Sequence, residues 1–88
     1  MSNKLVEEGW AACVHMLPAG KSVYSWEGEV CAENETLLLI KTAADPAILT
    51  RFILDSHPYE CPEIIGIEVS DGHREYLEWI EKLTKGKS

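Results

Sequence analysis

The residues with the greatest chemical potential lie together in one short segment, residues 57–62. Its sequence, His-Pro-Tyr-Glu-Cys-Pro, places an imidazole, a phenol, a carboxylate and a thiol next to two prolines. Loops often carry binding and catalytic groups, and this mixture could bind a metal ion or move a proton. The alternative is a structural connection in which the prolines shape the turn and the polar groups satisfy nearby backbone atoms. The residue types leave both interpretations open.

A second candidate is the pair Cys13 and His15. On a strand, residues two apart point to the same side, so this pair would offer a thiolate and an imidazole suited to copper or zinc. The alternative is a strand with a buried cysteine and one polar neighbour, because two ligands do not make a closed metal site.

Aromatic residues and one lysine form the third group of candidates. Tyr24, Trp26 and Trp79 either line a ligand pocket or anchor the core or a subunit interface. Lys41 ends an apolar run, where its cation either reaches solvent or pairs with a partner or a bound anion.

Composition excludes several classes of function. The formal net charge is −7, which repels a nucleic-acid backbone. No apolar run is long enough to span a bilayer, and the N-terminal residues do not resemble a signal peptide. Three widely spaced cysteines fit neither a disulfide framework nor a zinc ribbon, which favours the reducing cytoplasm. No specific catalytic motif occurs, so we do not expect an enzyme.

The first half of the chain predicts a long β-hairpin. Residues 3–9 predict the end of a helix, with Gly9 at its C-terminus. Residues 11–17 predict a short buried strand closed by a turn at Pro-Ala-Gly, residues 18–20. Residues 22–30 favour an extended chain with a bulge at Glu27-Gly28, and residues 32–35 a polar break. Residues 36–42 predict a strand covered on both faces.

The second half predicts a helix, a strand and a helix. Asp45 and Pro46 start the first helix, and His57-Pro58 ends it. Residues 62–69 predict a strand. A C-terminal amphipathic helix follows, its apolar stripe formed by Tyr76, Trp79, Ile80 and Leu83. The order indicates a single α+β domain over residues 1–88, a ferredoxin-like βαββαβ sandwich with an antiparallel sheet, its first strand absent and a C-terminal helix added. So small a domain is expected to gain stability by self-association.

Five sequence blocks resemble the CutA family of divalent-cation tolerance proteins. In order from residue 4 to about residue 80, they are Lys-Leu-Val-Glu-Glu-Gly-Trp-Ala-Ala-Cys-Val, Val-Tyr-Ser-Trp-Glu-Gly-Glu-Val, Leu-Leu-Leu-Ile-Lys-Thr, His-Pro-Tyr-Glu-Cys-Pro-Glu-Ile-Ile and Tyr-Leu-Glu-Trp-Ile. The resemblance implies a homotrimer with PII-like architecture that binds copper or another divalent metal, does not need the metal to fold, and acts in the response to metal ions. The alternative is a PII-like ligand-sensing or scaffold trimer with a small-molecule site between subunits and only incidental metal binding.

The resemblance also implies particular site residues. The family's copper ligands are a first-strand cysteine and two histidines before Pro-Tyr. The second histidine matches His57, the first falls on Ser56, and the cysteine has no counterpart because this sequence opens within the family's first helix. Trp26, Lys41, Tyr59 and Glu60 match family blocks, which predicts a pocket between subunits.

Overall fold

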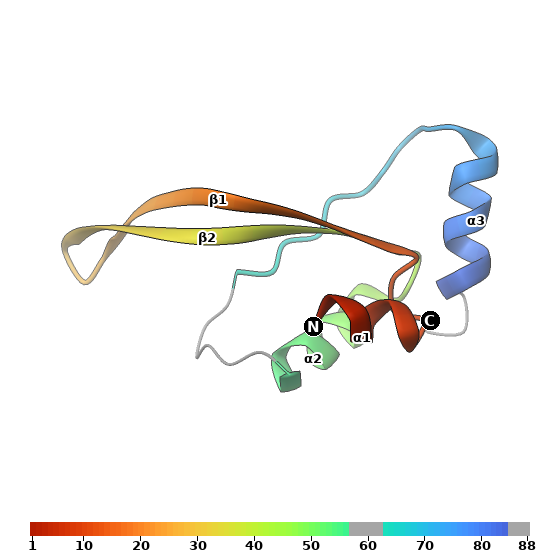
Figure 1. The fold of residues 1–88 in the computed structure, drawn as a ribbon, viewed down its shortest axis with the longest axis horizontal. Coiled ribbons are helices and arrows are strands. Elements are labelled where there is room, and N and C mark those ends of the chain that lie inside the picture. Colours follow the sequence, from red (N-terminus) through yellow and green to blue (C-terminus); the bar gives the residue numbers. More distant parts are fainter. Residues whose placement is uncertain (57–62, 85–88) are drawn as a thin grey trace.

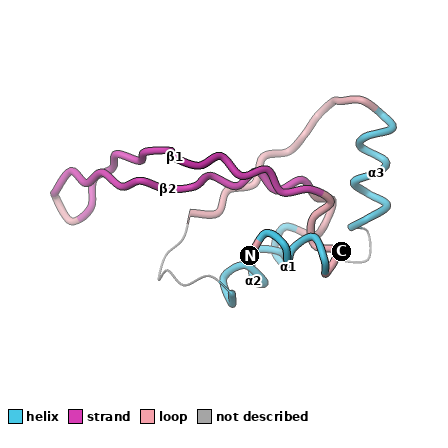
Figure 2. The backbone as a smooth tube through the Cα atoms, in the orientation of Figure 1, coloured by secondary structure: helices cyan, strands magenta, loops and turns pink. Residues whose placement is uncertain are grey.

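The computed structural model describes residues 1–56 and 63–84. Its elements are helix α1 (Ser2–Glu7), strands β1 (Cys13–Trp26) and β2 (Glu29–Lys41), and helices α2 (Pro46–Ser56) and α3 (Arg74–Thr84). The two strands form a long arm, and the helices gather at the end opposite its turn (Figure 1). A long connection that is neither helix nor strand, residues 63–73, leads into α3 (Figure 2).

Helix α1 is short and ends where the glycine predicts. Gly9 has a positive φ of 78°, a conformation that glycine adopts without steric cost. The chain then turns back, and the N–H of Trp10 donates to the carbonyl of Leu5 at 2.9 Å. This return places the fully buried Leu5 against the rest of the core.

The hairpin is confirmed, but the predicted position of its turn is wrong. β1 and β2 pair antiparallel from Trp26↔Glu29 to Cys13↔Lys41. Glu27 and Gly28 both have positive φ, as a two-residue turn between twisted strands requires, and therefore form the turn rather than a bulge. Residues 32–35, predicted as a break, lie within β2 because polar side chains can point outward from an exposed strand.

The predicted turn at residues 18–20 is also wrong. The register shifts between Leu17 and Gly20, so this segment is an irregularity inside one continuous strand. Ala19 has a φ of 63°, and a Cβ on Gly20 would lie 3.2 Å from the carbonyl oxygen of Glu35. Proline removes one ladder donor, and the bulge accommodates that loss without ending the strand.

Helix α2 begins as predicted, and the His57-Pro58 pair predicted to end it lies outside the described residues. The carboxylate of Asp45 accepts hydrogen bonds from the N–H groups of Ala47 and Ile48, at 2.9 and 3.3 Å. The buried face of α2 meets α1 and the base of the hairpin. The resulting core contains Leu5, Ala11, Ala44, Leu49 and Ile53, with Trp10, Val14, Ile40, Phe52 and Ile64 packed against it. The Trp10 and Phe52 rings stack with centroids 4.7 Å apart.

The strand predicted over residues 62–69 is not found in its described part. Residues 63–69 form neither helix nor strand, and the sheet of the described residues contains only β1 and β2. A strand needs a neighbour that pairs with its backbone. Ile64 packs against the core, whereas Ile65, Ile67 and Val69 are exposed.

Helix α3 is confirmed, but most of its predicted apolar stripe does not face the core. Tyr76, Trp79 and Leu83 are exposed, while Leu77 and Ile80 are half-buried. The fully buried Thr84 joins the last turn of α3 to the end of β2. Its hydroxyl donates to the carbonyl of Ile80 at 2.8 Å and accepts from the N–H of Ala43 at 2.9 Å.

The chain exposes more surface than a compact monomer of its mass. A folded chain of 9.9 kDa is expected to expose about 5200 Å², and this chain exposes 7194 Å². The radius of gyration is 14.7 Å, against about 12 Å expected for this length. The projecting hairpin explains both differences. The strand expected to be covered on both faces is covered on one, because Leu37 and Leu39 are exposed on the outer face.

Candidate functional site

The predicted pocket residues that the structure describes lie at opposite ends of the hairpin. Trp26 ends β1 beside the turn and is 59% exposed. Lys41 ends β2 at the base and is half-buried. Trp26 and Lys41 are separated along the hairpin by the 13 residues of β2. At the rise of a strand, this length corresponds to roughly 40 Å. A pocket containing both residues therefore requires two copies of the chain. His57, Tyr59 and Glu60 lie outside the described residues, as do Pro58, Cys61 and Pro62.

Cys13 and His15 do share a side of β1, as the period of a strand predicts. They pair with Lys41 and Leu39, so all four residues lie on the outer face of the sheet. Cys13 is half-buried and His15 is exposed. Within residues 1–56 and 63–84, no group of three or more His, Cys, Asp or Glu side chains is placed to hold a metal ion.

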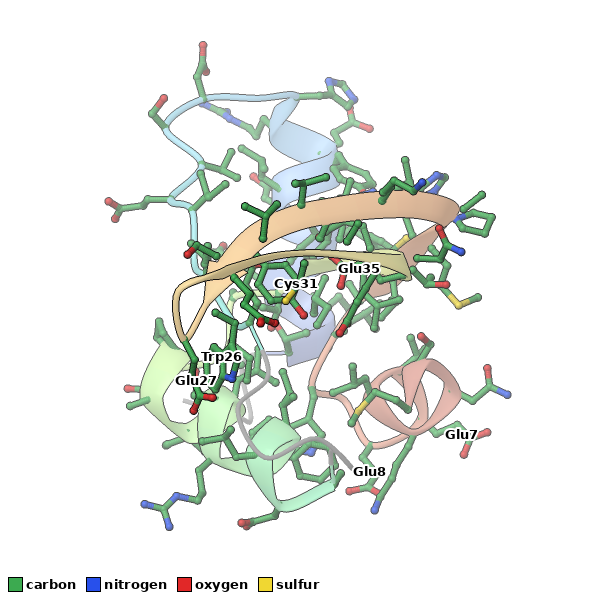
Figure 3. The ribbon with its side chains drawn as sticks, turned by 90° about the vertical axis from the view of Figure 1, so that its left-hand side faces the viewer. Glu7, Glu8, Trp26, Glu27, Cys31 and Glu35 are labelled. Atoms are coloured by element: carbon green, nitrogen blue, oxygen red, sulfur yellow. The ribbon has the colours of Figure 1, made fainter. Side chains whose placement is uncertain are left out.

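The outer face becomes polar and acidic towards the hairpin turn. We call this region the acidic face; it comprises Ser22, Tyr24, Glu29, Cys31, Glu33 and Glu35. The Tyr24 hydroxyl donates to Oε1 of Glu33 at 2.7 Å, and the Ser22 hydroxyl donates to Oε1 of Glu35. Figure 3 shows Cys31 and Glu35 on the hairpin and Trp26 and Glu27 at its turn. Two hydroxyls therefore hold two carboxylates in place across the strands.

Tyr24, on the acidic face, loses its proton at a higher pH than an ordinary tyrosine. Its hydrogen bond to Glu33 is the largest cause, followed by desolvation and the charge of Glu33, and together these raise the pKa of Tyr24 from 10.0 to about 12. The physical reason is that the hydrogen bond to the Glu33 carboxylate exists only while the phenol keeps its proton, and that the carboxylate charge repels the phenolate.

We expect Glu33→Gln to move the Tyr24 titration from near pH 12 towards its ordinary value of 10.0. The folded-state pKa is raised, so the stabilisation is complete below pH 10 and is lost as pH rises towards 12. Ultraviolet titration of tyrosinate measures the shift, and Tyr24→Phe assigns the late step. Glu27→Gln, at the turn, is the matched control. A late step that persists in Glu33→Gln would contradict this origin.

The site residues predicted from the sequence did not include these cross-strand pairs. Ser22 and Tyr24 alternate on β1, as Glu33 and Glu35 do on β2, and that spacing was visible in the sequence. The pairing depends on the turn, and a turn at residues 32–35 would have left the glutamates unpaired. Placing it at Glu27-Gly28 gives the register in which Tyr24 lies opposite Cys31 and diagonal to Glu33.

The fold belongs to a known class of small α+β proteins. It superposes on the divalent-cation tolerance protein CutA1 of Thermus thermophilus with a TM-score of 0.88 and 40% sequence identity, covering 94% of this chain and 82% of that one. It superposes on the PII-like protein CutA of Nostoc sp. PCC 7120, in its apo form, with a TM-score of 0.83 and 41% identity over 94% and 82% of the two chains. The class is therefore the PII-like, ferredoxin-like fold.

Sequence comparison identifies the family within that class. The model of the CutA1 divalent ion tolerance protein family matches residues 1–83. The Thermus divalent-cation tolerance protein CutA is 43% identical over 86 residues, which span 96% of this chain and 82% of the relative. This chain belongs to the CutA1 divalent ion tolerance protein family.

A plant relative is longer. The chloroplastic protein CutA of Arabidopsis thaliana is 40% identical over 97% of this chain, but the match spans 47% of the relative. Among the described residues, no helix combines the length and apolar character needed to cross a membrane.

Proposed function

We propose that this chain is a homotrimeric, non-enzymatic protein of divalent-cation tolerance that binds copper or another divalent metal through His57. The observation that carries the proposal is the family match over residues 1–83 together with the superposition on the Thermus protein. We place the protein in the cytoplasm, where the free thiols Cys13 and Cys31 stay reduced.

The surface of the chain supports the trimer. Apolar side chains on the outer face of the hairpin remain exposed at its base, namely Leu17, Leu37 and Leu39, and so do Tyr76, Trp79 and Leu83 on α3. The excess over a compact monomer is about 2000 Å², which is the scale of a stable protein interface. Association of three hairpins would cover this surface and would bring Trp26 of one copy towards Lys41 of another. We propose that Tyr59 and Glu60 contribute to the same pocket between subunits, as their match to the family blocks predicts.

Light scattering after size-exclusion chromatography is expected to give a mass of about 30 kDa, three times the chain mass of 9.9 kDa. Leu37→Glu places a charge in the proposed interface and is expected to yield the single-chain mass. Ile48→Glu, at an exposed apolar position on α2, is the control and should keep the trimer mass. The unfolding temperature of the wild type should also rise with concentration. A single-chain mass for the wild type would refute the trimer.

Copper titration tests the binding residue. Calorimetry with Cu(II) is expected to show saturable binding that weakens by at least about tenfold in His57→Ala, because even loss of an outer-shell partner costs about 10–100-fold. His73→Ala removes an exposed imidazole just before α3 and is the matched control. Equal affinity in the wild type and His57→Ala would exclude His57 as a ligand.

The second candidate is a PII-like ligand-sensing or scaffold trimer with a small-molecule site between subunits. The superposition on a PII-like protein favours it, as does the half-buried cation of Lys41. In this alternative, metal binding is incidental and insensitive to His57→Ala. The copper titration therefore separates the two functions.

A further inference from the structure

One dipeptide in the turn before α3 brings a carboxyl group and a backbone nitrogen into contact. Asp71 is followed by Gly72, and both residues are exposed and lie between the elements. The N–H of Gly72 donates to Oδ1 of Asp71 at 2.9 Å. The carbon that carries this oxygen is therefore held beside the Gly72 nitrogen. In Figure 1 this turn is the last part of the connection that leads into α3.

A backbone nitrogen beside a carboxyl carbon can close a five-membered ring. In that reaction, the Gly72 nitrogen attacks Cγ of Asp71 and a new C–N bond forms. The acid form of the carboxyl group loses its hydroxyl and the nitrogen loses its proton, so one water leaves and a succinimide remains. Such ring closure is favoured where the reacting atoms are held close together, at about 3–3.5 Å.

Water then opens the succinimide ring in one of two ways. Attack at Cγ breaks the new C–N bond and restores aspartate. Attack at the main-chain carbonyl carbon of Asp71 breaks the original peptide C–N bond, so the chain now passes through Cγ as isoaspartate. Opening consumes the one water that closure released, and isoaspartate therefore has the mass of aspartate.

The surroundings of the three aspartates distinguish Asp71 from the other two. The residue after Asp71 is a glycine, which has no Cβ to shield its nitrogen. Asp45 precedes Pro46, whose nitrogen carries no proton to lose, and its carboxylate caps α2. Asp55 lies within α2, where ring closure would break the regular helical backbone. Asp71 is therefore the aspartate whose surroundings favour ring closure.

The same turn sets the entry into α3. A Cβ on Gly72 would lie 3.4 Å from two methyl carbons of Leu77, so the glycine packs beside this helix residue. The N–H of Leu77 donates to the carbonyl of His73 at 3.0 Å, in the first turn of the helix. Isoaspartate would add one backbone atom directly before these contacts and would place the carboxylate on Cα. Isomerisation would therefore lengthen the turn where α3 begins.

We propose that Asp71-Gly72 is a site of spontaneous covalent modification, at which aspartate converts through a succinimide to isoaspartate in the folded protein. Water is the only co-reactant. The exposed turn admits it, and the hydrogen bond from Gly72 holds the carboxyl group at the nitrogen that attacks it. This inference goes beyond the proposed metal function and does not depend on it.

Storage of the whole folded protein at neutral pH, followed by peptide mapping, tests the proposal. An endoprotease that cuts before aspartate and not before isoaspartate reports on each aspartate separately. We expect the cut between Ser70 and Asp71 to be lost progressively, while the cuts before Asp45 and Asp55 persist. Mass spectrometry should also detect an intermediate that is lighter by one water and contains Asp71.

Two glycine variants test the mechanism. In Gly72→Ala the added Cβ makes an ordinary van der Waals contact with Leu77, so the fold is kept. The side chain shields the nitrogen, and we expect the conversion to slow by about tenfold. Gly66→Ala is the matched control, because its Cβ meets nothing within 4 Å, and it should leave the rate unchanged. A persistent cut before Asp71, equal loss of the cut before Asp55, or an unchanged rate in Gly72→Ala would overturn the proposal.

Discussion

Leu5→Ala is expected to lower the free energy of unfolding by about 2–5 kcal/mol, the range for truncating a buried leucine. Leu5 is 0% exposed and lies where α1 meets the other core residues. Its carbonyl also accepts the N–H groups of Trp10 and Ala11, so the backbone around it is fixed and cannot collapse into the space left by the side chain. In a core this small, one such cavity removes a large fraction of the stability.

Urea unfolding at a fixed protein concentration measures the loss. Leu54→Ala is the matched control, because the same substitution falls at a 47%-exposed position on α2 and is expected to cost less than about 1 kcal/mol. Similar losses in the two variants would mean that α1 contributes no more than a surface helix, and the described core would have to be reassigned to α2 and the sheet.

The local elements of this fold were predictable where adjacent residues determine them. Gly9 at the end of α1 and Asp45 at the start of α2 each satisfy a local backbone requirement, and both predictions are confirmed. The family was also predictable, because its sequence blocks extend over most of the chain and the family model matches residues 1–83.

The predictions that failed concern pairing between distant residues. Glu27-Gly28 and residues 32–35 are both polar interruptions, and only the cross-strand register shows that the first is the turn. Ile65, Ile67 and Val69 alternate like a strand, yet no neighbour pairs with them in the described residues. Residue periodicity specifies a strand's faces and does not supply its partner.

The candidate site was predictable only in part for the same reason. A resemblance assigns Trp26 and Lys41 to one pocket, whereas in a single chain they are separated by the length of the hairpin. A pocket that contains both would need symmetry between copies, and no pattern within one sequence specifies that symmetry. The acidic face, in contrast, needs only the hairpin register and is present in one chain.

Thr84→Val is expected to lower the free energy of unfolding by about 1–3 kcal/mol, because it removes two hydrogen bonds while keeping the branched shape of the side chain. The Thr84 hydroxyl is fully buried and connects the Ile80 carbonyl of α3 to the Ala43 N–H after β2. A second hydroxyl continues the connection: Thr42 donates to the carbonyl of Trp10 at 2.5 Å and accepts from the N–H of Ala44 at 2.9 Å. The end of β2 is thereby tied both to α3 and to the segment after α1.

Urea unfolding again gives the magnitude, and hydrogen exchange gives the location. Thr36→Val, at an exposed position on β2, is the control and should change stability by less than about 0.5 kcal/mol. We expect amide exchange in the last turn of α3 to accelerate in Thr84→Val before the rest of the chain responds, since the lost contacts join α3 to the sheet. Unchanged exchange in α3 together with unchanged stability would show that apolar packing alone holds this helix, through Leu77 and Ile80.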